Sequence, residues 1–227
     1  PIGMPFKRAG DDSLIRLEGL YLVVDPTIPH PKLLEIVKKA LRGGVDILQL
    51  WGATEQNRGK ILALAKNLLN LSNDYDVPLV INNDLQLSKA ISAHGMHMDG
   101  YDTTPSDVRK ALGRQSIVGY TVGNDLKRVK WAETVGANYV SFCAVFPTTS
   151  VAQCDIIPLR TIKLAKSMIH IPVFASGGIN LDNAHLILET GVDGIAVVSS
   201  ILKASDPEQA AKSFNAIIRR YRSQSIL

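Results

Sequence analysis

The sequence contains only two cysteines, Cys143 and Cys154, among its 227 residues. Two cysteines cannot form the disulfide framework of a small secreted domain, so we expect reduced thiols and a cytoplasmic location. No apolar run approaches the roughly 20 residues that a membrane-spanning helix needs, and the opening stretch, PIGMPFKRAGDD, lacks the layout of a secretory signal. These absences argue against secreted and membrane-spanning classes and predict that the chain has no membrane partner.

A strong excess of charge of either sign is also missing. The chain has 25 lysines and arginines against 21 aspartates and glutamates, which gives a formal charge of +4. Its densest basic run, residues 218–222, suits a solvated helix face, and no nucleic-acid-binding motif accompanies it. We therefore expect no nucleic-acid partner. The hydrophobic content of 46% is that of a globular protein with a large core.

Eight short apolar runs are the clearest feature that the sequence does have. Each is four or five residues long and apolar on both faces, which is typical of parallel strands covered on both sides. The runs lie at residues 20–24, 46–50, 78–81, 95–98, 117–121, 138–142, 172–175 and 194–198. Segments with helical spacing follow them, at residues 31–42, 56–72, 84–92, 105–112, 125–135, 158–168, 181–190 and 207–222. Eight βα units in one chain predict an α/β fold, the (β/α)8 TIM barrel.

A weak internal repeat supports this fold. Gly44-Val45-Asp46, Gly136-Ala137-Asn138 and Gly191-Val192-Asp193 each follow a predicted helix and open a strand, and the glycine suits a left-handed helix stop. No linker rich in proline or serine divides the chain. We therefore expect one domain over residues 1–227, with residues 1–15 as an N-terminal extension.

Two small-residue pairs indicate a phosphate site. In TIM barrels, functional groups lie at the carboxyl ends of the strands and in the loops that follow. After the seventh and eighth predicted strands come Gly177-Gly178 and Ser199-Ser200, and we expect each pair to open a helix. Backbone N–H groups and hydroxyls at helix N-termini favour anions, and phosphate sites recur at these two strands in this fold. A tight turn and a helix cap would explain each pair alone, but together they predict phosphate binding.

A group of oxygen-bearing side chains follows the third and fourth predicted strands. Asn82, Asn83, Asp84, Asp99 and Asp102 offer the ligand atoms that Mg²⁺ accepts. Asp102 is the best candidate ligand, whereas Asp84 also suits the N-cap of the helix that starts there.

Several catalytic groups are absent. No lysine stands at a predicted strand end, which argues against a Schiff-base aldolase, and no His/Cys cluster has zinc spacing. No glutamate lies at a strand end to serve as an isomerase base. His97 and Cys143 are expected to be core residues. The loop Thr148-Thr149-Ser150 either adds hydroxyl donors to a phosphate or a ring, or is an ordinary polar loop.

With these residues placed, the chain resembles the thiamine phosphate synthase family, which includes the thiazole tautomerases. The matching stretches follow one another in order over nearly the whole chain. They are LYLVVD (20–25), GGVDILQL (43–50), PLVINND (78–84), HGMHMDGYD (94–102), IVGYT (117–121), GANYVSFCAVFPTTS (136–150), IPVFASGGI (171–179) and GVDGIAVVSSIL (191–202).

The resemblance implies a TIM-barrel transferase that joins hydroxymethylpyrimidine diphosphate to thiazole phosphate. Pyrophosphate leaves first, and the thiazole nitrogen attacks the resulting pyrimidine cation. A leaving group with roughly three negative charges calls for Mg²⁺ and fixed cations in the site.

Residue by residue, the thiazole-phosphate half of the family site is retained. Its phosphate cup is matched by Gly178, Val198 and Ser199, with Gly177 and Ser200 beside them. Its thiazole-phosphate loop is matched by Thr148, Thr149 and Ser150. The pyrimidine-diphosphate contacts are matched by Gln49, Asn82 and Thr121, where threonine replaces the usual serine, and one Mg²⁺ ligand by Asp102.

The pyrophosphate half is not retained. The family pattern Gln-x-Arg-x-Lys after the second strand reads Gln49-Leu50-Trp51-Gly52-Ala53 here, so both cations are missing. The family's first Mg²⁺ aspartate falls at Asn83, which weakens the expected metal site, and a further lysine falls at Val151. The base of the tautomerases, a histidine, falls at Gly123. The loss of several charged groups from one subsite is expected to lower the rate of the synthase reaction severely.

Three functions remain open at this point. The first is a divergent synthase whose replacement cations, such as Arg58 or Lys60, come from the next helix. The second is a family member that binds a phosphorylated, less charged ligand stacked on Trp51, with a regulatory role or a different chemistry. The third is another enzyme class that uses Asp25, Asp99 or Asp102 as a base. The sequence leaves open whether the chain forms a homo-oligomer.

Overall fold

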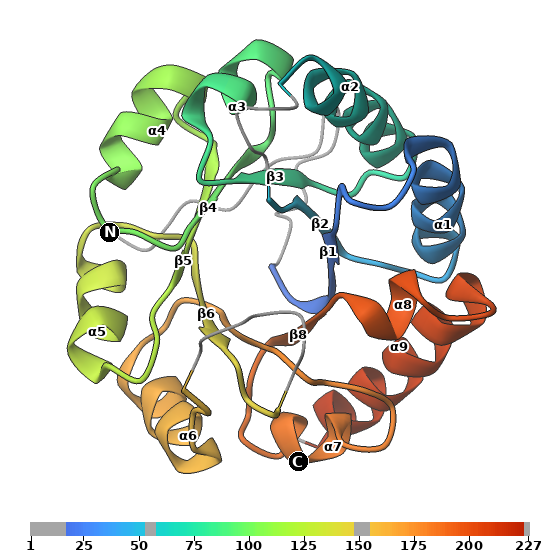
Figure 1. The fold of residues 1–227 in the computed structure, drawn as a ribbon. Coiled ribbons are helices and arrows are strands. Elements are labelled where there is room, and N and C mark those ends of the chain that lie inside the picture. The colour runs from blue at the N-terminus through green and yellow to red at the C-terminus, as the bar shows by residue number, and fades with distance from the viewer. Residues whose placement is uncertain (1–16, 53–57, 148–154, 225–227) are drawn as a thin grey trace.

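Eight parallel strands form a closed barrel in sequence order, which confirms the predicted TIM barrel (Figure 1). The computed structural model describes residues 17–52, 58–147 and 155–224. The strands are β1 (Gly19–Val24), β2 (Ile47–Leu50), β3 (Leu79–Asn82), β4 (Gly95–Met98), β5 (Ile117–Thr121), β6 (Tyr139–Cys143), β7 (Val173–Ser176) and β8 (Gly194–Val197). Each lies within one or two residues of its predicted position, because strands buried on both sides appear in the sequence as continuous apolar runs.

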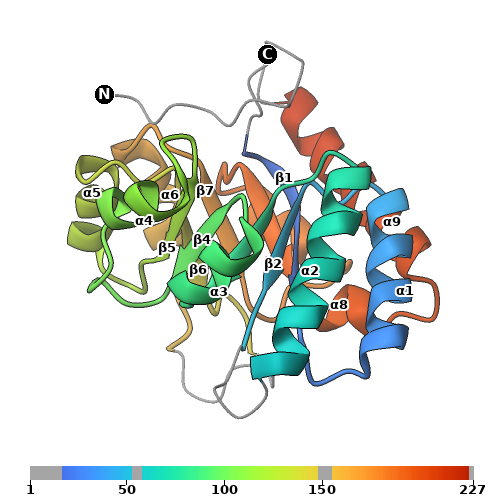
Figure 2. The same ribbon diagram turned by 90° about the horizontal axis from the view of Figure 1, so that it is seen from above.

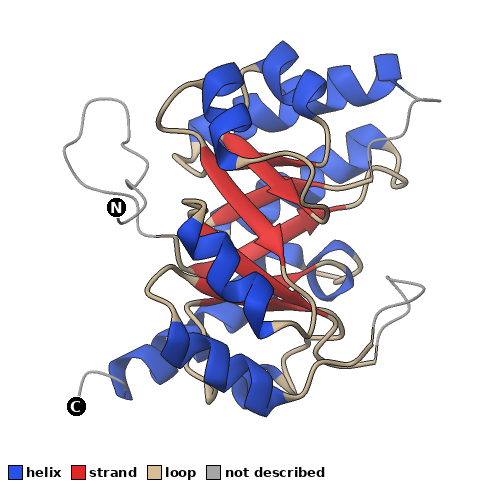
Figure 3. Cartoon of the chain, turned by 90° about the vertical axis from the view of Figure 1, so that its left-hand side faces the viewer, coloured by secondary structure: helices blue, strands red, loops and turns tan. Residues whose placement is uncertain are grey.

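Helices surround the barrel, as the views from above and from the side show (Figures 2 and 3). They are α1 (His30–Arg42), α2 (Arg58–Asp74), α3 (Leu85–Ile91), α4 (Pro105–Leu112), α5 (Leu126–Thr134), α6 (Leu159–Met168), α7 (Ala184–Leu188), α8 (Ser199–Leu202) and α9 (Pro207–Gln224). Helix α3 starts where expected because Asp84 caps it and accepts a 2.8 Å hydrogen bond from the Leu87 N–H. In the described part of the chain, no helix is long and apolar enough to cross a membrane.

Two predictions about the segment after β7 are wrong, and the segment after β8 contains one helix more than expected. Helix α7 covers only Ala184–Leu188 instead of residues 181–190, because Asn180 and Asn183 hold the preceding residues in a turn through their side-chain oxygens. Gly177-Gly178 therefore does not open a helix, whereas Ser199 does open α8. Helix α8 is an additional helix that precedes α9, and its four residues are too few to show a helical period in the sequence.

The weak sequence repeat corresponds to a repeated contact at the amino-terminal end of the barrel. The residue directly before each even-numbered strand accepts a hydrogen bond through its side chain. The donor is the backbone N–H of the first or second residue of the preceding odd-numbered strand. The acceptor–donor pairs are Asp46 with Leu20, His94 with Leu79, Asn138 with Val118 and Asp193 with Val173, at 2.8, 3.0, 2.9 and 2.8 Å. These bonds link the strands in four successive pairs.

The barrel interior is filled below its mouth. Tyr21, Tyr139 and Phe174 point inward from β1, β6 and β7 and meet edge to face, with ring centroids 5.4–5.9 Å apart. A second and larger apolar layer packs between the strands and the helices. Because the interior aromatics close the lower barrel, the space for a ligand lies at the carboxyl ends of the strands.

Candidate functional site

A cavity of about 740 Å³ opens at the carboxyl ends of the strands, where the sequence predicted a site. Residues of β1, β2 and β4 to β8, or of the loops after them, line it. Its volume is in the range that holds a small organic ligand. The candidate site is therefore built by nearly the whole barrel.

Glycines shape the side of the cavity at β7. Gly177 and Gly178 have φ of +90° and +70°, a left-handed conformation that favours glycine. A Cβ on Gly177 would lie 2.6 Å from Ala144 Cα, and one on Gly178 would lie 2.6 Å from the Pro147 carbonyl oxygen. The two glycines thus let the loop after β7 lie directly against the loop after β6.

The serine pair completes this side from β8. Ser199 is exposed and begins α8, while the hydroxyl of Ser200 donates a 2.6 Å hydrogen bond to the Ile179 carbonyl. Within the described residues, the backbone N–H groups of Gly178 and Ser199 donate to no protein acceptor. N–H groups that lack a protein acceptor and border a cavity favour an anion such as a phosphate.

A chain of buried hydrogen bonds crosses the cavity floor. Tyr21 Oη donates to Gln49 Oε1 over 2.7 Å and lies 2.8 Å from Tyr139 Oη. Tyr139 Oη lies 2.9 Å from Nδ1 of His97, whose Nε2 lies 2.9 Å from Thr121 Oγ1. These bonds fix Gln49 and Thr121, two of the predicted ligand contacts, through residues that face the barrel interior.

His97 is a buried and hydrogen-bonded core residue, as expected, although its ring also reaches the cavity wall. Burial lowers the pKa of its imidazole to about 4, against a small opposing effect of Asp99. The ring is therefore neutral near pH 7 and carries no charge to a ligand.

Asp99 is the centre of the polar group after β3 and β4. Its carboxylate accepts hydrogen bonds from Asn82 Nδ2 (3.0 Å), Asn83 Nδ2 (2.8 Å) and Thr121 Oγ1 (2.8 Å). Burial raises the pKa of the Asp99 carboxyl, but the nearby His97 and the three donated hydrogen bonds lower it by more. Asp99 is thus held as a carboxylate at the cavity wall, with its side chain 48% exposed.

No cation balances Asp99 in the described wall of the cavity, where it is the only charged side chain. Residues 53–57 and 148–154, which follow Gly52 and Pro147 in the sequence, lie outside the described residues, and they contain no lysine or arginine. Lys60, one of the expected replacement cations, is exposed on α2 and does not line the cavity. The side chain of Arg58, the other, is outside the described part.

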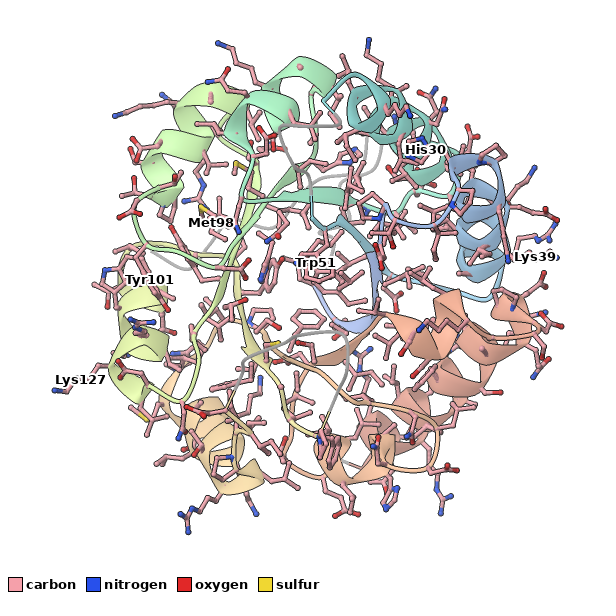
Figure 4. The ribbon with its side chains drawn as sticks, in the orientation of Figure 1. His30, Lys39, Trp51, Met98, Tyr101 and Lys127 are labelled. Atoms are coloured by element: carbon pink, nitrogen blue, oxygen red, sulfur yellow. The ribbon has the colours of Figure 1, made fainter. Side chains whose placement is uncertain are left out.

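Trp51 follows β2, at one of the two positions where the resemblance described above implies a cation. Trp51 is half-buried, and its backbone N–H donates a 3.1 Å hydrogen bond to the Val24 carbonyl. Its side chain lies near the barrel axis (Figure 4). It lines the cavity together with Gln49. An indole therefore borders the cavity at the position where that resemblance implies an arginine.

The residues after β3 and β4 do not form a metal site. Asn83 Oδ1 accepts a 2.9 Å hydrogen bond from the Asp99 N–H, and its Nδ2 faces the Asp99 carboxylate. Asp102 is exposed and does not line the cavity. Within the described ranges, no three His, Cys, Asp or Glu side chains are grouped to hold a metal ion. The described side chains thus offer a metal ion one cavity-lining carboxylate, that of Asp99, instead of a grouped set of protein ligands.

The structure gathers most of the predicted ligand contacts around one cavity. Those that line it are Gln49, Trp51, Thr121, Gly177, Gly178, Val198, Ser199 and Ser200. Asn82 and Asn83 lie one hydrogen bond away, behind Asp99. Thr148, Thr149 and Ser150 lie outside the described residues. The prediction that Cys143 is a core residue is wrong, because Cys143 is half-buried and lines the cavity.

Tyr21, Tyr139 and Ser141 were not expected at the site. All three point into the barrel from β1 and β6, and Tyr21 and Ser141 reach the cavity. The two tyrosines are 118 positions apart. The sequence signal for them is the alternation of side chains along a strand, which places every second residue inside the barrel.

Comparison with known proteins gives a consistent result. Residues 20–201 match a family model described as thiamine monophosphate synthase. A thiamine-phosphate synthase of Nitrosomonas eutropha is 34% identical over 203 residues, which cover 89% of this chain and 95% of that protein. Another, from Desulfitobacterium hafniense, is 37% identical over 196 residues, which cover 86% and 94%.

A solved structure agrees with these relatives. Thiamine phosphate pyrophosphorylase from Pyrococcus furiosus superposes with a TM-score of 0.76 at 29% identity, over 89% of this chain and 96% of that chain. Orotidine 5'-phosphate decarboxylase from Pyrococcus horikoshii, at 14% identity and a TM-score of 0.64, is similar in fold alone. Because the family model spans most of the chain and curated relatives exceed 30% identity, the chain belongs to the thiamine monophosphate synthase family.

Proposed function

We propose that this chain binds the thiazole phosphate of its family but has lost efficient coupling of that ligand to hydroxymethylpyrimidine diphosphate. The observation that carries the proposal is the charge of the cavity: its described wall holds one carboxylate and no cation. The cavity thereby combines a phosphate-binding side, made of Gly178 and Ser199, with a diphosphate-binding side that lacks the family's cations. We call those missing cations the pyrophosphate clamp.

The ligand's phosphate would lie at β7 and β8. There it would accept hydrogen bonds from the backbone N–H groups of Gly178 and Ser199, which have no protein acceptor in the described part of the chain. The thiazole ring would extend toward Trp51 and Gln49, which line the same cavity. Because Gln49 is fixed by Tyr21, its amide is already oriented before a ligand arrives.

The coupling step fails for an electrostatic reason. Departure of pyrophosphate concentrates negative charge in the site, and the cavity offers Asp99 and the Trp51 ring in that region. The loss of one stabilising donor slows such a step by roughly 100- to 1,000-fold. The chain lacks three of the family's cations, at Trp51, Ala53 and Val151.

A coupling assay tests this proposal. Purified protein is mixed with both substrates and Mg²⁺, and thiamine phosphate is measured beside the Desulfitobacterium hafniense relative under the same conditions. We expect turnover at least about 1,000-fold below that of the relative. Comparable turnover would show that cations from elsewhere, such as Arg58, replace the missing clamp.

A further inference from the structure

The cavity has opposite electrostatic character on its two sides. In a closed eight-stranded barrel with sequential strand order, β4 and β8 lie across the barrel from each other (Figure 1). Asp99 follows β4 and Ser199 follows β8, and both line the same cavity. A ligand that fills the cavity therefore meets a carboxylate on one side and anion-binding donors on the other.

The Asp99 carboxylate is oriented but not neutralised. Its three hydrogen-bond donors, Asn82, Asn83 and Thr121, are all uncharged. The basic group beside it is His97, whose Nε2 lies 3.9 Å from Asp99 Oδ1 and which is neutral near pH 7. Among the described side chains, no lysine or arginine forms an ion pair with Asp99. Its negative charge is thus available to a ligand.

Trp51 adds a second surface with the same preference. Indole is the aromatic ring that attracts cations most strongly over its face. Trp51 lines the cavity from the loop after β2, and its side chain lies inside the ring of strands (Figure 4). A carboxylate and an indole at one cavity favour a positively charged ring and disfavour a diphosphate.

We propose that the cavity selects ligands that carry a phosphate at one end and a positively charged heteroaromatic ring at the other. Asp99 and Trp51 recognise the ring, and the loops after β7 and β8 hold the phosphate. This inference rests on the phosphate site of the proposed function and extends it to the charge of the ligand's ring.

Two nearly isosteric probes test the inference by calorimetric titration. The first is thiazole phosphate, whose ring is neutral, and the second is the same molecule methylated at the ring nitrogen, which makes a thiazolium. We expect the wild-type chain to bind the thiazolium phosphate about tenfold more tightly, and this ratio to fall as salt is added. Asp99→Asn should bring the two affinities close to each other without abolishing binding of the neutral probe.

Asp206→Asn is the matched control. Asp206 is exposed before α9 and accepts a 3.1 Å hydrogen bond from the Glu208 N–H, and it does not line the described cavity. The same loss of charge there should leave the probe preference unchanged. Trp51→Leu is a second variant, expected to reduce the preference if Asp99→Asn does not fold.

The outcomes separate this inference from the function on which it rests. If neither probe binds the wild-type chain, the phosphate site itself is wrong. If both bind with equal affinity, or if the preference survives in a folded Asp99→Asn variant, the phosphate site stands and the role of Asp99 is overturned.

Discussion

At the scale of single residues, Trp51 decides how the site differs from its family. The stretch LQLWGAT places an indole and an alanine at the two cation positions after β2. Trp51 lines the cavity, while Ala53 lies outside the described residues. The substitution changes both the charge and the shape of the wall, since a ring occupies volume that a flexible cation would leave open to a diphosphate.

Restoring the family cations should restore pyrophosphate binding. We expect the double variant Trp51→Arg, Ala53→Lys to bind pyrophosphate with Mg²⁺ at least about tenfold more tightly than wild type, because two cations then face the anion. Calorimetric titration measures this change. A control that adds the same charges at exposed positions at the other end of the barrel, Asn73→Lys with Gln115→Arg, should not gain affinity. Equal affinity in both variants would show that LQLWGAT is not part of the clamp.

His97 should make stability depend on pH. Its pKa of about 4 in the folded chain lies below the usual 6.5, so the unfolded chain takes up a proton first as the pH falls. The contribution of neutral His97 to the free energy of unfolding is complete above about pH 6.5. The free energy of unfolding then falls by about 3 kcal/mol between pH 6.5 and pH 4. His97→Gln should reduce this loss when urea unfolding is measured at pH 7 and at pH 4.5. An equal loss in wild type and variant would contradict the prediction, and His170→Gln, at an exposed histidine, is the control.

At the scale of elements, the amino-terminal turns tie the barrel strands together in pairs. Asn138 is buried, and its Oδ1 accepts hydrogen bonds from the Val118 N–H and from Arg109, at 2.9 Å each. These residues come from three elements, so one side chain joins β5, α4 and the start of β6. The sequence repeat marks three of the four positions, Asp46, Asn138 and Asp193, each two residues after a glycine, whereas His94 accepts through a ring nitrogen and lies outside the repeat.

Removing one of these acceptors should destabilise the barrel. We expect Asn138→Ala to lower the free energy of unfolding by about 1–3 kcal/mol, because the buried Val118 N–H then lacks a partner. Urea unfolding measures the change. Asn124→Ala, in an exposed loop, is the control and should change it by about 0.5 kcal/mol or less. A loss at Asn138 no larger than at Asn124 would show that the turns do not bear on stability.

The same scale explains what could be predicted from the sequence. The eight strands were predictable because apolar runs of four or five residues are too short for helices and are typical of parallel strands covered on both sides. Helix α3 was predictable because Asp84 is a good cap. Helix α8 was not, since four residues show no period. The hydrogen bond between Tyr21 and Tyr139 could not be predicted either, because the two residues are 118 positions apart and no local sequence pattern indicates such a contact.

At the scale of the whole molecule, the barrel brings β4 and β8 to opposite sides of one cavity. The cavity-lining pairs of the proposed phosphate side could be located from the sequence because they are short local motifs, Gly177-Gly178 and Ser199-Ser200, at predicted strand ends. Asp99 could not be recognised as its counterpart, because its role depends on Asn82, Asn83 and Thr121, which meet only when the barrel closes. The proposed function thus rests on an arrangement that no single motif contains.

The most direct test of this account is a thermal-shift titration with thiazole phosphate and with pyrophosphate plus Mg²⁺, side by side. We predict that thiazole phosphate raises Tm by about 5–10 °C at 100 times its Kd, because the site holds one phosphate and binds only the folded chain. Pyrophosphate with Mg²⁺ should leave Tm unchanged over the same concentrations. A large shift with pyrophosphate and none with thiazole phosphate would contradict the account.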